Sequence, residues 1–139
     1  MKAFSQGFYT LLRSHIAFGT LLAHGTASVY SPQAPQGEDL PFVEFRKMAN
    51  TPQYTLTGEA YENAVYQVKA VDKSPSAALA ETIAGEILLA LEDQSTALTG
   101  YRSVMFLRRE SDLPDIEELV EGQVYVHRGF LFRIWAQPN

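Results

Sequence analysis

The sequence predicts an α+β fold: an antiparallel (mixed) β-sheet of about four to five strands with two to three helices packed on one face. Two observations predict it. Segments with strand-like alternation stand on both sides of one long helical segment, and strict strand–helix–strand alternation is absent. The chain has 139 residues, the length of one ordinary domain, so we expect residues 1–139 to form a single domain.

Two short helices are expected at the start of the chain. The segment Lys2–Arg13 carries one apolar stripe at helical spacing, made by Phe4, Phe8, Leu11 and Leu12. The segment Ile16–Ala23 is expected to form a second helix that ends near Gly25, since glycine is favoured just after a helix.

Strand segments follow a proline-rich loop. Ser28–Tyr30 reads as a short extended piece, and two prolines and a glycine make residues 31–39 a loop. The segment Phe42–Met48 alternates as a half-buried strand does, and Tyr61–Asp72 is expected to form the next strand. Between them, Ala49–Glu59 is mostly polar with a proline and a glycine, which predicts a long connection of the kind that is often functional.

A long helix is expected over Pro75–Glu92. Ser74 is a suitable N-cap and Pro75 a suitable first helical residue. The expected apolar stripe comprises Leu79, Ile83, Ile87, Leu88 and Leu91.

Two more strands complete the expected sheet. Tyr101–Arg109 and Gln123–Gln137 both alternate, and Ser111–Gly122 between them is expected to be an acidic loop around Pro114. In the last strand, alternation places Tyr125 and Trp135 on one face and the aromatic pair Phe130 and Phe132 on the other.

Composition excludes several function classes. The net charge is -5 and the pI about 5.1, whereas a nucleic-acid binder needs a clustered basic face. There is no cysteine, which removes disulfides, zinc–thiolate sites and cysteine nucleophiles. No stretch approaches the roughly 20 apolar residues of a membrane span, so we expect no membrane association.

The candidate chemical groups form no recognisable site. His15 and His24 would fall on opposite faces of one helix, and His127 is expected to be a surface or hydrogen-bonded histidine on the polar face of the last strand. The acidic loop fails as an EF-hand, because Pro114 occupies the third position counted from Asp112 and the sixth lacks glycine. We therefore predict no catalytic residues, no metal and no cofactor.

Arginines gather on the last two predicted strands. Their expected role is to face the acidic loop or a neighbouring subunit, rather than to bind phosphate. They are Arg102, Arg108, Arg109, Arg128 and Arg133.

The segment from Val29 to Phe45 resembles phage tail completion proteins. It has Val29-Tyr30, then Ala-Pro-Gln-Gly37, then Leu40-Pro41 and an apolar strand. The likeness continues through Thr51-Pro52 and the strand Val65–Val71, the alanine- and leucine-rich helix, and the closing His127–Trp135. The likeness covers about Leu11 to Ala136. The chain therefore resembles a member of the tail completion, or tail terminator, family.

The resemblance implies a non-enzymatic virion protein at the tail end or neck, made in the host cytoplasm. Members are expected to form a homo-oligomeric ring, usually a hexamer, that caps the tail tube protein and joins it to the head-side connector or stopper. DNA passes through the pore without specific binding, which an acidic chain suits.

The two long connections are the natural docking elements of such a ring. We expect Tyr54 and Leu56 to contact a partner in the tail or connector. The candidate partner contacts in the acidic loop are Asp112, Asp115, Glu117 and Glu118.

Two rival functions stay open. One is a head completion (stopper) or minor neck protein of the same virion. The other is a small α+β domain that binds a ligand in a cleft between helix and sheet, which would need convergent polar groups. A deep pocket near His127 and Arg133 would favour it.

Overall fold

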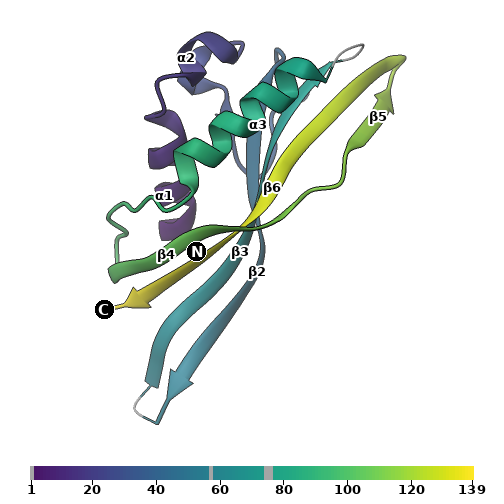
Figure 1. Cartoon of the computed structure of the whole chain (residues 1–139). Helices are drawn as coiled ribbons and strands as arrows, with labels where there is room; N and C mark the ends of the chain where they lie inside the picture. Colours follow the sequence, from purple (N-terminus) through teal and green to yellow (C-terminus); the bar gives the residue numbers. More distant parts are fainter. Residues whose placement is uncertain (1, 57, 74–76) are drawn as a thin grey trace.

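The computed structural model describes residues 2–56, 58–73 and 77–139 (Figure 1). They form one mixed β-sheet with the helices on one face, which confirms the predicted α+β class. In chain order the elements are α1 (Lys2–Arg13), α2 (Phe18–Leu21), the 3₁₀ turn η1 (Gly25–Ala27), β1 (Val29–Tyr30), β2 (Phe42–Thr55), β3 (Gly58–Lys73), α3 (Ala78–Leu91), β4 (Tyr101–Asp112), β5 (Ile116–Val120) and β6 (Gln123–Pro138).

The six strands have the order β1-β2-β3-β6-β4, and β5 also pairs with β6. β1 runs parallel to β2, and all the other described pairs are antiparallel. The centre of the sheet is the β3–β6 pair, whose register continues without a bulge from Glu62 opposite Ala136 to Lys73 opposite Tyr125.

Aromatic side chains join the first helix to the sheet. The ring of Phe8 in α1 lies 4.4 Å from the ring of Tyr66 in β3 and 5.6 Å from that of Phe45 in β2, measured between centroids. All three side chains are buried, and such pairs stabilise a core by about 0.5–1.5 kcal/mol beyond the burial of their area. The predicted helix Lys2–Arg13 is confirmed with the same bounds.

The second helix is shorter than predicted. It spans only Phe18–Leu21, because the backbone beyond it bonds elsewhere. The amide of Ala23 donates to the carbonyl of Pro41, and that of His24 donates to the hydroxyl of Ser28. Gly25 has φ +60° and begins the 3₁₀ turn, so the glycine serves a tight turn as its type suggests.

Helix α3 packs against the sheet along Ala80, Ile83, Ala84, Ile87, Ala90 and Leu91. The predicted stripe was wrong at Leu79, which is 38% exposed because it lies one position away from that face. The predicted cap, Ser74-Pro75, lies outside the described residues. Within the described part of the chain, no helix combines the length and apolar character that a membrane crossing requires.

The predicted long connection at residues 49–59 is mostly strand. β2 continues to Thr55 and β3 begins at Gly58, with Thr55 opposite Gly58 at the end of the ladder. Proline is tolerated at position 52 because β2 is at the edge of the sheet there, where a missing N–H costs no ladder bond on the outer side.

The predicted acidic loop also contains a strand. Ile116–Val120 forms β5, which pairs with Gln123–His127 of β6 across a tight turn. Glu121 and Gly122 have φ +51° and +80°, as the two central residues of a type I′ hairpin turn require. The sequence Glu-Gly therefore marked a hairpin, and the sheet gains one strand.

Candidate interaction surfaces

The β2–β3 hairpin projects from the helix-covered body at one end of the molecule (Figure 1). Leu56, close to its tip, is fully exposed. Tyr54 is in β2 beside it, and its side chain lies outside the described residues. The two residues predicted to contact a partner are therefore carried on a strand-supported tip rather than on a long irregular loop.

The β5–β6 hairpin projects at the opposite end of the sheet (Figure 1). Every residue of β5 is exposed, and Ile116 and Leu119 keep 45% and 71% of their surface in contact with solvent. A strand that packed on a core would bury every second side chain. Apolar residues exposed on both faces of one strand are typical of a surface that meets another protein.

Three of the four acidic residues predicted as partner contacts lie beside arginines of the same chain. Asp112 lies 3.3 Å from Arg109, and Asp115 and Glu117 each lie 3.3 Å from Arg128. Glu118, in contrast, forms no ion pair with a described residue. Their role as partner contacts stays a prediction.

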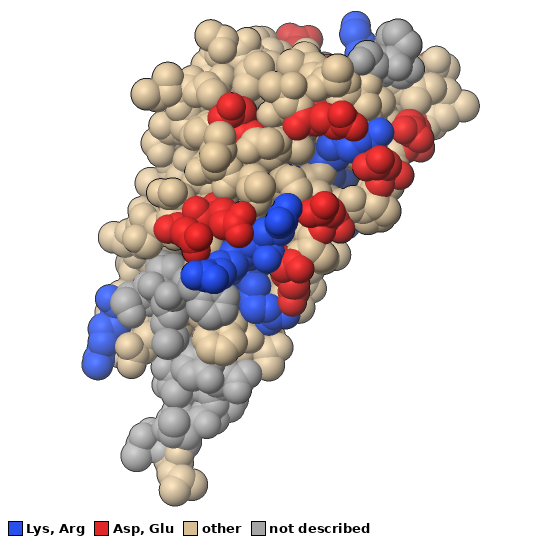
Figure 2. All heavy atoms as spheres, in the orientation of Figure 1, with Lys and Arg blue, Asp and Glu red and all other residues tan. Residues whose placement is uncertain are grey.

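Arg128 is the centre of the largest of these clusters. Its guanidinium is also 3.7 Å from Glu81 of α3, and its side chain is 11% exposed. One cation thus joins the start of α3 to Asp115 and to β5. Figure 2 shows acidic and basic side chains interleaved on this face. The prediction that the arginines face the acidic segment is confirmed for Arg128 and Arg109.

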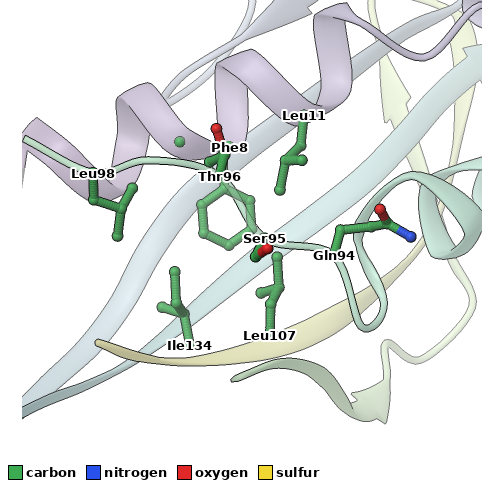
Figure 3. A pocket seen from close by; sticks show the side chains of 9 residues that line it. Phe8, Leu11, Gln94, Ser95, Thr96, Leu98, Leu107 and Ile134 are labelled. Atoms are coloured by element: carbon green, nitrogen blue, oxygen red, sulfur yellow. The ribbon is translucent and has the colours of Figure 1, made fainter. Parts of the chain in front are cut away.

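An open hollow of about 270 Å³ lies between α3 and β6, but the space between α1 and the sheet is nearly filled. The cavity there has a volume of about 10 Å³ and is lined by the apolar side chains of Phe8, Leu107 and Ile134 among others (Figure 3). It is about as large as one water molecule needs, and an apolar void of this size stays empty. The cleft that a ligand-binding domain would require is not formed among the described residues at this position.

A larger hollow, of about 320 Å³, lies on the other face of the sheet. The loop Gln33–Leu40 forms one wall, and Lys69, Tyr125 and His127 contribute from the sheet. Glu118 of β5 also lines it, whereas Arg133 does not. The hollow is open and carries charges of both signs, and Lys69 and Glu44 in its lining lie 4.0 Å apart.

His127 departs from its prediction. Both of its ring nitrogens are buried and have no hydrogen-bond partner among the described residues, so of the two expected alternatives, a surface or a hydrogen-bonded histidine, the second was wrong. Burial lowers the pKa of His127, with a further lowering by Lys69 and Arg128 and an opposing effect of Glu118. The imidazole is therefore neutral near pH 7.

The other two histidines pair with carboxylates in separate places. Nε2 of His15 lies 2.6 Å from Oε2 of Glu86 in α3, and Nε2 of His24 lies 3.0 Å from Oδ2 of Asp39. Within the residues that the structure describes, no three histidine or acidic side chains stand close enough to bind a metal ion. Each pair joins an N-terminal element to the rest of the fold.

Comparison with known proteins gives one family. A family described as tail completion protein gp17 matches residues 6–135. No curated protein sequence matches the chain. A chain in the solved structure of the virion of a native gene transfer agent (GTA) particle has a similar fold, with a TM-score of 0.72 and 17% sequence identity, over 98% of this chain and 96% of that chain.

Proposed function

The chain belongs to the tail completion protein gp17 family, which consists of structural, non-enzymatic virion proteins, and we propose that it completes a phage tail as a closed ring. In this role a hexameric ring caps the last ring of the tail tube protein. It stops tube growth and presents a surface to the connector or stopper on the head side. DNA passes through the central pore.

The observation that best supports this role is the placement of two hairpins at opposite ends of one sheet (Figure 1). A protein that joins two different assemblies needs two separate contact surfaces. The β2–β3 hairpin exposes Leu56, and the β5–β6 hairpin exposes Ile116 and Leu119. Exposed apolar groups on projecting elements suit contacts that are made only during assembly.

The two hairpins differ in chemistry, which suits two different partners. Exposed Leu56 makes the first one apolar near its tip, and we assign Tyr54 and Leu56 to a contact with the tube or the connector. The second carries Asp115, Glu117 and Glu118, so its partner would offer basic groups. Asp112 is at the end of β4, next to this second surface.

The charge of the chain supports passage of DNA without binding. A subunit with a net charge of -5 repels the phosphate backbone on balance. Phosphate contacts by arginine or lysine dominate nonspecific affinity for DNA, and several of the arginines here are already paired with carboxylates.

Electron microscopy of the purified protein, alone and mixed with tail tubes, tests the proposal. We expect closed rings or added density at one end of each tube. The variant Leu56→Asp should lose binding to its partner, because a charge at the tip cannot enter an apolar contact. The variant Ile16→Asp is the matched control, since Ile16 is an exposed apolar residue away from both hairpins.

Two results would count against the proposal in different ways. A protein that stays monomeric and ignores tube ends does not complete tails. A ring that binds the head-side connector but no tube would instead support the stopper role. Equal binding by wild type and Leu56→Asp would leave the ring in place and remove Leu56 from the contact.

A further inference from the structure

We propose that neighbouring copies of this chain join through two oppositely charged strand segments, β5 of one copy and residues 46–49 of β2 of the next. The inference rests on the proposed ring and names the contact that closes it. Each subunit would use one segment toward each neighbour, so that Glu118 and Leu119 face the next copy while Asp115, Ile116 and Glu117 are left for the second assembly.

Both segments are exposed on both faces of the sheet. Arg46, Lys47, Met48 and Ala49 are successive residues of β2, and all are exposed, as are all five residues of β5. Met48 is 49% and Leu119 is 71% exposed. A partner that covered either segment would bury apolar side chains that the subunit leaves in water.

Both segments also have a free edge. In the described residues, β1 pairs with β2 only at Val43 and Glu44, so the outer side of residues 46–49 carries no strand. β5 pairs with β6 alone. The two edges are on opposite sides of the sheet. A ring needs two different surfaces of this kind on each subunit, because its contacts are head-to-tail.

The two segments carry complementary charges, and Glu117, which pairs with Arg128, is set aside here. Arg46 and Lys47 form no ion pair with any described residue, and neither do Glu118 and Glu121 of the β5 hairpin. Opposite charges that no internal partner satisfies favour the contact and guide its approach.

The neighbouring strand β4 offers a weaker alternative. It lies on the same side of β6 as β5, but several of its charged groups are already paired. Arg108 lies 3.1 Å from Asp93, and Arg109 lies 3.3 Å from Asp112. A neighbour that used this edge would have to compete with those pairs.

The register of the sheet gives the geometry of the contact. Phe42, Val71, His127 and Ile116 occupy one row across β2, β3, β6 and β5. In the same register, Glu118 is level with a point on β2 two residues before Phe42. For Glu118 of one copy to lie beside Arg46 of the next, the two copies must be shifted along the strands by about six residues, or ~20 Å. The four strands from β2 to β5 are together about 19 Å wide. A shift of ~20 Å across this width would incline the strands by roughly 45° to the ring axis, close to the 35–45° typical of closed sheets.

Charge reversal on full-length protein tests the contact, with ring formation measured by mass photometry and by capping of tail tubes. The variants are R46E/K47E, E118K/E121K, a 1:1 mixture of the two, and the control R102E, which changes an exposed arginine of β4. Each double variant alone should lower the ring population at least about tenfold, because both its segments then carry the same sign. The mixture should restore rings, because every contact then joins opposite signs.

The wild-type protein separates this inference from the proposed function. If the wild type forms no ring and caps no tube, the proposed function fails and this contact with it. If the wild type forms rings and either double variant does so equally well, or the mixture stays unassembled, only the strand contact is overturned. Thermal melting of each variant shows that the subunit is folded, and loss of rings in R102E as severe as in the double variants would assign the contact to β4 and overturn ours.

Discussion

Gly129 of β6 lies directly opposite Lys69 of β3, and a β-carbon built on it would be 2.5 Å from Cα of Lys69 and 2.2 Å from the carbonyl oxygen of Val68. Both neighbours are backbone atoms in the central strand pair, so they cannot move aside. The glycine allows the two strands to approach at this row.

Replacement of this glycine should therefore destabilise the fold strongly. We expect Gly129→Ala to lower the free energy of unfolding by about 3 kcal/mol or more, since a buried clash displaces backbone. Denaturant unfolding measures it. Gly85→Ala in α3 is the control, because its β-carbon would meet nothing within 4 Å. This substitution should leave the free energy of unfolding unchanged or raise it by up to about 1 kcal/mol. Equal stability of Gly129→Ala and wild type would contradict the strand spacing.

The pair between His15 and Glu86 ties the segment after α1 to α3. Its side chains are 22% and 27% exposed, and Nε2 lies 2.6 Å from the carboxylate oxygen. We expect His15→Gln to lower the free energy of unfolding by about 1 kcal/mol, as loss of a partly buried hydrogen bond to a charged group does. The largely exposed pair of Arg108 and Asp93 serves as the comparison, and Arg108→Gln should change stability by less than about 0.5 kcal/mol. Similar losses in both variants would argue against a special role of His15.

Arg128 should control the order of the β5 hairpin more than global stability. It contacts carboxylates of Glu81, Asp115 and Glu117, which are all largely exposed. We expect Arg128→Gln to accelerate hydrogen exchange of amides 113–120 several-fold while the β3–β6 amides stay protected. Mass spectrometry after deuterium labelling reads both. The comparison variant Arg109→Gln removes one exposed ion pair and should leave hydrogen exchange in the hairpin unchanged. Equal acceleration of exchange in both variants would contradict the role of Arg128 in ordering the β5 hairpin.

The buried imidazole of His127 should make stability depend on pH. Burial lowers its pKa in the folded protein below the ordinary value of 6.5, so the unfolded chain binds the proton more readily. The free energy of unfolding should therefore fall as the pH drops below about 6.5 and level off below the folded-state pKa.

A comparison of wild type and variant isolates this contribution, because other groups titrate in the same range. His127→Gln should show a shallower loss of melting temperature between pH 7.5 and 5 than the wild type. Parallel curves for wild type and His127→Gln would mean that His127 is accessible to protons in the folded state.

Local periodicity predicted those helices and strands whose structure is decided by residues close to one another in the sequence. The helix Lys2–Arg13 and the last strand were correct because one apolar face repeats through each of them. Residues 49–59 were predicted as a connection because of Pro52 and Gly58. Pairing with β3 extends the strand regardless, and no local signal shows that the outer side of β2 is free.

The candidate surfaces were only partly predictable. The Glu121-Gly122 turn is a hairpin signal, which the dense acidic composition obscured. The hollow at His127 could not be foreseen, since it depends on where the loop Gln33–Leu40 folds over the sheet. That Asp115 and Glu117 share Arg128 likewise follows from a contact between distant segments.

The unbroken β3–β6 ladder has a mechanical consequence. β3 starts at the tip of one projecting hairpin and ends opposite Tyr125, and β6 starts at the turn of the other. The twelve paired rows from Glu62 to Lys73 span roughly 40 Å, so the pair is a stiff strut between the two ends. A force on one hairpin is therefore transmitted to the other along the two strands. The hydrogen bonds between the strands share the load, and the ladder has no bulge that would act as a hinge.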